Sequence, residues 1–242
     1  MIKAARIVLV ISLAFCLAAC ASSRERHLKK RYLANDYPYN SSGLKRVAVV
    51  ALDACTQYHP DLMAFTSALH SQLQSIEGLE VLPDGAALAA ISQGSLALPR
   101  DGLKLADSLG ADGLFVAVIT DYNPYGEPVL AVGLMLFART ITPISRPDLD
   151  KIIQGGMPIA LPESYTSGPV AAVFDVYDVS QRTTRHRVEL YAAGQASGEV
   201  GPGWERYYRS MPHFMRFVTY EIVWSLFTDL EAQKAVKASR RR

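Results

Sequence analysis

The sequence predicts an α/β domain, with α+β as the alternative, in which helices pack on a mixed sheet of about five or six strands. Short apolar runs of strand length alternate with segments whose apolar residues recur every three or four positions. Residues 105–122, LADSLGADGLFVAVITDY, hold a helix end, a glycine turn and a strand that is apolar on both faces. Such a strand is typical of the centre of a covered sheet. At 242 residues the chain suits one compact domain with a linker and a tail.

The first half of the domain is expected to alternate strands and helices. Continuous apolar runs predict strands at 46–52 and 79–82, and apolar stripes predict helices at 60–78, 83–91 and 103–109. Glycines follow the first and the last of these helices, and glycine is the usual residue at a helix end. This order favours at least partly parallel pairing of the strands.

Two hairpins are expected in the second half. Residues 114–120 and 129–137 are apolar runs that flank the turn sequence NPYG, so they should pair with each other. Residues 170–176 and 188–192 alternate apolar and polar side chains around a polar turn. That period of two predicts a second antiparallel hairpin with one wetter face.

A long C-terminal helix is predicted from Trp204 to Glu231, with a middle that is apolar nearly all round. Arg216, Glu221 and Asp229 interrupt it too often for a segment that spans a bilayer. A helix this apolar should be buried on more than one side. Packing across its own sheet and additional packing against a neighbouring subunit both remain possible at this stage.

Residues 139–168 interrupt the regular pattern with four prolines and a pair of glycines. Long connections of this kind are usually functional or disordered, so this insertion is the expected contact surface, together with the aromatic last helix. The residues expected to contact a partner are Ile144, Leu149, Ile152, Ile159, Tyr165, Trp204, Phe214 and Trp224.

The first 19 residues have the features of a secretory signal: two basic residues, then an apolar stretch. The sequence LAAC at 17–20 resembles a bacterial lipobox, which implies cleavage before Cys20 and acylation of that cysteine. The alternative is an ordinary signal cut near Ala19 or Ala21. Because Ala21 rather than aspartate follows the cysteine, the resemblance implies an outer-membrane lipoprotein that faces the periplasm. The membrane is thus the first expected partner, through Cys20.

Residues 20–43 are basic and turn-rich, and predict a flexible tether between the lipidated cysteine and a domain at 44–232. A coil of that length would span roughly 25 to 30 Å. A basic tail, 233–242, ends the chain. Removing Lys3 and Arg6 with the signal leaves 25 − 2 = 23 basic against 23 acidic residues, so charge gives no argument for nucleic acid as a partner.

Sequence signatures of catalysis are missing. The five histidines show no metal-ligand spacing, and the chain has no CxxC, GxSxG or P-loop motif. Cys55 is expected to be a buried, inert thiol, and Asp112 to accept backbone hydrogen bonds in a turn. We therefore expect no enzyme activity, no cofactor, no metal and no small-molecule substrate.

Three segments, 45–52, 105–122 and FDVYD at 174–178, resemble those of the TolB amino-terminal-like α/β domains of bacterial lipoproteins, the CsgG- and PelC-like group. The resemblance covers about residues 45–196. It implies a periplasmic α/β domain used for assembly, often in rings, with no catalytic residues to carry over. The insertion and the aromatic last helix depart from the family pattern. The long alternating hairpins of pore-forming members are missing, so a channel is not expected.

The sequence thus favours a lipid-anchored envelope scaffold or accessory protein that acts by binding envelope proteins, possibly as a homo-oligomer. A tethered regulator of a periplasmic envelope enzyme is the alternative. A hydrolase with an unrecognised site is a remote third.

Overall fold

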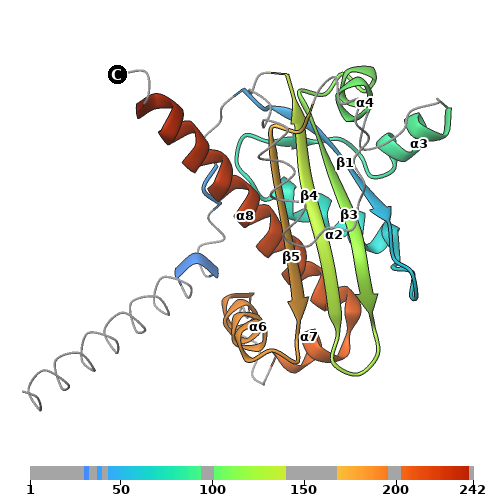
Figure 1. Ribbon diagram of the computed structural model, residues 1–242, viewed down its shortest axis with the longest axis vertical. Coiled ribbons are helices and arrows are strands. Elements are labelled where there is room, and N and C mark those ends of the chain that lie inside the picture. Colours follow the sequence, from blue (N-terminus) through green and yellow to red (C-terminus); the bar gives the residue numbers. More distant parts are fainter. Residues whose placement is uncertain are drawn as a thin grey trace, which may run out of the picture.

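The computed structural model (Figure 1) describes residues 30–32, 37–39, 43–93, 101–139, 168–195 and 203–239. Its strands are β1 (Arg46–Asp53), β2 (Glu80–Val81), β3 (Gly113–Asn123), β4 (Val129–Ala138) and β5 (Ala171–Asp178). Its helices are α2 (Leu62–Gln74), α3 (Ala86–Gln93), α4 (Gly102–Ser108), α6 (Arg182–Gln195), α7 (Glu205–Arg209) and α8 (Met211–Ser239).

The described strands form one mixed sheet in the order β2-β1-β3-β4-β5. β1 lies parallel to both β2 and β3, whereas β4 runs antiparallel to both β3 and β5. β3 is therefore the central strand, as the apolar stretch 105–122 predicted, and it pairs with β4 as the expected hairpin. This sheet confirms the predicted fold class.

Helices cover both faces of the sheet. α2 and the long α8 pack on one face, and α3 and α4 lie on the other (Figure 1). Alternate residues of β3 enter the two cores: Phe115 packs with the α2 and α8 side, and Val116 packs with the α4 side. The helix α8 thus packs across its own sheet and against α2, which explains its apolar composition within a single chain.

The junction between α4 and β3 ties the two parallel strands together. Gly110 closes the helix with φ of +62°, a conformation that favours glycine. Asp112 follows, and its Oδ2 atom accepts hydrogen bonds from the backbone N–H groups of Lys45 (3.0 Å) and Arg46 (2.9 Å). Asp112 therefore accepts backbone hydrogen bonds, as the sequence predicted, and these bonds hold the start of β1 beside β3.

The second predicted hairpin is wrong, because residues 182–195 form the helix α6 and not a strand. Its buried residues include Thr184, Val188, Tyr191 and Ala192, whose spacings of four, three and one mark a helical face. Leu190 is buried as well, so the set also fits a period of two over a short run. The local pattern was compatible with both structures, and packing against the domain decided between them.

The C-terminal helix differs from the prediction at both ends. Ser210, with an extended backbone (φ −132°, ψ 109°), separates α7 from α8. At the other end α8 continues to Ser239, into the region predicted as a basic tail. Within the described residues, none of the helices has the length and apolarity needed to cross a bilayer.

Candidate functional site: an ionic cluster that docks the N-terminal segment

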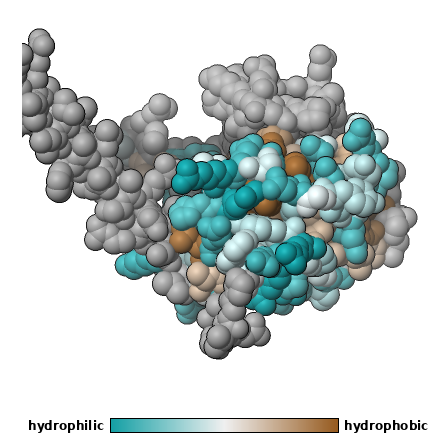
Figure 2. Space-filling model, turned by 90° about the horizontal axis from the view of Figure 1, so that it is seen from below, coloured by the Kyte–Doolittle hydropathy of each residue, from teal (hydrophilic) through white to brown (hydrophobic). Residues whose placement is uncertain are grey.

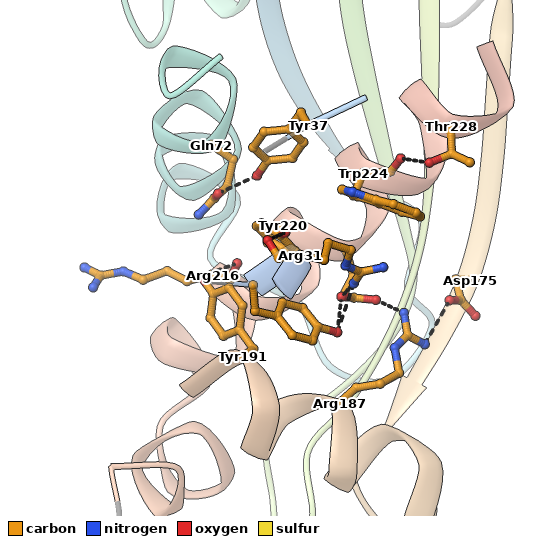
Figure 3. A network of polar contacts seen from close by, with 12 residues as sticks. Arg31, Tyr37, Gln72, Asp175, Arg187, Tyr191, Arg216, Tyr220, Trp224 and Thr228 are labelled. Atoms are coloured by element: carbon orange, nitrogen blue, oxygen red, sulfur yellow. Dashed lines mark hydrogen bonds and ion pairs between the residues drawn. The ribbon is translucent and has the colours of Figure 1, made fainter. Parts of the chain in front are cut away.

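The carboxylate of Glu221 is fully buried in the middle of α8 and forms the centre of a polar cluster (Figure 3). The guanidinium groups of Arg31 and Arg187 contact its two oxygens, and the Tyr32 hydroxyl donates a hydrogen bond of 2.6 Å to Oε1. A buried carboxylate is costly unless it is paired and hydrogen-bonded, and Glu221 has both kinds of partner.

The two arginines are far apart in the sequence. Arg31 lies in a helical turn at 30–32, and Arg187 lies on α6 and is 3.8 Å from Asp175 on β5. Two guanidinium groups thus face two carboxylates, so the cluster is neutral as a whole. The Arg31 guanidinium carbon is also 4.3 Å from the ring centroid of Trp224, a cation–π distance.

Tyrosine rings surround this ionic cluster and fix residues 30–32 and 37–39 to the domain. Tyr32 lies edge-on to Tyr191 with 5.8 Å between ring centroids, and Tyr37 lies 5.2 Å from Tyr220. The Tyr37 hydroxyl donates to Gln72 on α2 at 2.8 Å. Burial raises the pKa of Tyr32 to about 12 and that of Tyr37 well above its usual range.

This docking departs from the predicted flexible tether at 20–43. Tyr32 is 1% exposed and Tyr37 is 7% exposed, so both are core residues of the domain. Tyr39 is half-buried beside Phe227 and donates to the backbone oxygen of Leu44 at 2.6 Å. The sequence did not predict that these tyrosines are buried, because the segment has few aliphatic side chains. Here the tyrosines supply the buried apolar area instead.

Three of the predicted partner-contact residues fall in the described part of the chain. Phe214 is fully buried in the core, which removes it from any surface of the single chain. Trp224 is half-buried beside Arg31, and Trp204 is half-buried with its ring 5.0 Å from Tyr208. The other predicted residues lie outside the described residues: Cys20, Ile144, Leu149, Ile152, Ile159 and Tyr165.

Glu221 and Arg187 are functional candidates that the sequence reading missed. In the sequence, Glu221 is only a charged residue that interrupts an apolar helix. That interruption was the available signal, because a lone carboxylate amid apolar residues on every side must find a buried partner. The identity of the partner could not be read, since Arg31 is 190 positions away.

Cys55 has the surroundings of an inert thiol, as predicted, although it is half-buried rather than fully enclosed. Its Sγ atom lies 3.6 Å from the backbone oxygen of Ile119. Burial, together with the nearby Asp53, raises the thiol pKa to about 12. The reactive thiolate is therefore scarce at neutral pH.

The described part of the chain contains no group of three or more His, Cys, Asp or Glu side chains that could hold a metal ion. Three histidines pair instead with single carboxylates: His59 with Asp53 at 2.5 Å, His70 with Asp84 at 2.7 Å and His186 with Glu189 at 3.7 Å.

Exposed aromatic side chains gather near the β3–β4 turn. Tyr125 in that turn is 67% exposed, and its ring lies 5.2 Å from that of Tyr58, which is 41% exposed. Met63, in the first turn of α2, is 58% exposed. Figure 2 shows that this end of the molecule is otherwise largely hydrophilic, with small separate apolar areas. Tyr58 and Tyr125 are named the aromatic tip.

No protein-family profile and no curated protein matches the sequence. Among solved structures, the chain is similar to the lipoprotein GNA1162 of Neisseria meningitidis (TM-score 0.37, 12% identity), with 65% of this chain and 99% of that chain covered. Bacterial lipoproteins are thus among its structural neighbours.

Two further neighbours are the C-terminal domain of LpoB from Salmonella enterica and the PelC dodecamer from Paraburkholderia phytofirmans. LpoB matches with a TM-score of 0.35 and 15% identity, over 62% of this chain and 91% of that chain. PelC matches with a TM-score of 0.32 and 10% identity, over 81% of this chain and 91% of that chain.

Proposed function

We propose that this protein is a lipid-anchored scaffold or accessory of the bacterial cell envelope, which binds a protein partner close to the outer-membrane surface. The observation that carries the proposal is the docking of residues 30–32 and 37–39 on the domain through Glu221 and the buried tyrosines. A segment that follows a lipidation signal and is also part of the core connects the anchor to a rigid body.

The length of chain between the anchor and the docked segment limits the reach of the domain. Nine residues, 21–29, separate Cys20 from Lys30. Fully extended, they span at most about 30 Å, and as a coil roughly 15 to 18 Å. An acyl group on Cys20 would therefore hold the domain near the headgroups, where the basic residues of 24–30 favour an anionic surface.

The aromatic tip is the proposed contact with the partner. Aromatic side chains are enriched at the energetic centres of protein interfaces, where they bury a large area with few rotatable bonds. Tyr58 and Tyr125 are partly exposed and lie side by side, with Met63 as an exposed apolar residue at the start of α2. The end of the molecule with the β3–β4 turn is largely hydrophilic (Figure 2), as is the rim of a typical interface.

Crosslinking in intact envelopes, followed by affinity purification, tests both parts of the proposal. The double variant Tyr58→Ser/Tyr125→Ser should lose the crosslinked partner while staying folded and membrane-bound. Val176→Ser is the matched control, because Val176 is an apolar residue that is 44% exposed on the edge strand β5. Loss of the partner only in the Val176 variant would move the interface to the sheet edge and contradict the proposal.

Membrane attachment is tested separately with Cys20→Ser, which should release the exported protein into the soluble periplasmic fraction. The alternative function, a tethered regulator of an envelope enzyme, requires a long flexible tether between the lipid anchor and the domain. The docking of residues 30–32 and 37–39 shortens the free part of the tether on which that alternative depends.

A further inference from the structure

Local side-chain contacts fix the two loops that carry the aromatic tip. Asp53, at the end of β1, pairs with His59 at 2.5 Å across the loop that carries Tyr58. In the β3–β4 turn, the side-chain oxygen of Asn123 accepts a hydrogen bond of 3.0 Å from the backbone N–H of Tyr125. The two exposed rings are therefore positioned before a partner arrives, which lowers the entropy that binding costs.

Two exposed carboxylates belong to the same edge of the sheet, at which the parallel strands β1 and β3 end (Figure 1). Asp61 lies between β1 and α2 and caps that helix, because its Oδ1 atom accepts from the backbone N–H of Ala64 at 2.9 Å. Asp121 lies near the end of β3, where the register with β4 shifts between Ile119 and Asp121. Such bulges often redirect a side chain.

The negative charge of this edge acts on neighbouring side chains. Burial raises the pKa of Tyr122 first, and the charge of Asp61 raises it further. Burial is also the main reason why the pKa of Cys55 rises to about 12, and Asp53 and then Asp121 add to that rise. Carboxylates within electrostatic reach thus act on a tyrosine and a thiol beside the aromatic tip.

Two basic side chains near the aromatic tip pair with carboxylates of their own. His59 pairs with Asp53, and Arg185 of α6 pairs at 2.5 Å with Glu127 in the β3–β4 turn. Asp61 adds negative charge beyond these two pairs, as does Asp121. The surface around the two rings therefore favours a positively charged partner.

We propose that the aromatic tip binds a basic segment of the partner protein, in which an arginine stacks on the two rings and pairs with Asp61 or Asp121. This inference rests on the proposed function, in which the aromatic tip contacts an envelope protein. A guanidinium group is attracted to the faces of aromatic rings, and its parallel N–H donors match a carboxylate. Complementary charge also speeds association and excludes acidic competitors.

NMR titration of the exported full chain in a neutral detergent tests this inference. The probe is the peptide Gly-Arg-Gly-Arg-Gly, blocked at both ends, and Gly-Gln-Gly-Gln-Gly is its uncharged match. The arginine peptide should shift the resonances of Tyr58 and Tyr125, and its binding should weaken as the salt concentration rises from about 50 to about 300 mM. The glutamine peptide should leave these resonances unchanged.

The double variant Asp61→Asn/Asp121→Asn should bind the arginine peptide about threefold to tenfold more weakly, because two exposed charges are lost. Asparagine is also a good helix cap, so α2 should keep its start. Glu77→Gln/Glu80→Gln is the matched control and should leave binding unchanged. It removes two exposed carboxylates at the opposite edge of the sheet, where Glu80 lies beside the first residue of β1.

Chitotetraose, a neutral glycan, represents the other class of partner that exposed aromatic rings can take. Binding of chitotetraose without binding of the arginine peptide would overturn the inference. Equal binding of the glutamine peptide, or equal weakening by the Glu77/Glu80 control, would overturn it too.

Crosslinking in intact envelopes separates this inference from the proposed function. If Tyr58→Ser/Tyr125→Ser loses the crosslinked partner while Asp61→Asn/Asp121→Asn retains it in full, the basic segment is excluded and the proposed function stands. If both double variants retain the partner, both proposals fail. Loss of the partner in both double variants, with the Glu77/Glu80 control unaffected, is the expected result.

Discussion

Replacing Glu221 with glutamine should destabilise the domain and release its N-terminal segment. The substitution keeps the shape of the side chain but removes the charge that two guanidinium groups share. Glu221 is 0% exposed and the Arg31 side chain only 9% exposed, so water cannot replace the lost partner at Arg31. The variant therefore leaves a buried charge without compensation.

The size of the effect follows from the burial of the three side chains. Breaking a buried ion pair from one side costs about 3 to 5 kcal/mol. The Arg187 side chain is 29% exposed and retains Asp175 at 3.8 Å, which places Glu221→Gln near the lower end, at about 3 kcal/mol. For a domain of this size the midpoint of thermal unfolding should fall by roughly 6 to 12 °C.

Thermal unfolding followed by circular dichroism measures the loss, and limited trypsin digestion measures the release. Cleavage after Arg31 should be slow in the parent protein and fast in the variant, because proteolysis needs the site to leave the core. Adding Arg31→Met should restore part of the stability, since no unpaired guanidinium then remains at that position. Glu205→Gln, in the exposed pair with Arg209, is the control and should change stability by less than about 0.5 kcal/mol. A Glu221→Gln variant as stable as this control, with Arg31 still protected, would refute the docking of the segment.

Three further predictions concern single groups. Asp112→Ala should cost about 1 kcal/mol in thermal unfolding and Asp112→Asn less, because the asparagine oxygen can still accept from the backbone of Lys45 or Arg46; no loss with alanine would contradict the junction geometry. At pH 8, Cys55 should react with a thiol reagent about a hundredfold or more slower than the same thiol in the unfolded chain, because burial raises its pKa; equal rates would show an accessible thiolate. The unfolding free energy should fall as pH rises from about 10 to 12, because the folded pKa of Tyr32 of about 12 lies above the unfolded value of 10.0 and the folded chain then binds more protons. Tyr32→Phe should reduce that slope by up to about 1.4 kcal/mol per pH unit, and an unchanged slope would exclude Tyr32 as a contributor.

Local features of the sequence were sufficient for the central part of the fold. The stretch 105–122 carries its own helix end, a glycine with positive φ and a doubly apolar strand, and each of these acts over a few residues. The β3–β4 hairpin was equally local, because a turn sequence separates two strands that pair directly. By contrast, α6 could not be predicted, since its short apolar set fits both helical and strand periods.

The sequence by itself predicted the alternation of strands and helices and the central place of β3 in the sheet. Lipidation at Cys20 is likewise a prediction from the sequence. Only the tertiary structure decided that Tyr32 and Tyr37 belong to the core and that Glu221 binds Arg31 and Tyr32. The physical reason is the separation of the partners along the chain. Glu221 is 190 positions from Arg31 and 34 from Arg187, so no local pattern relates their charges.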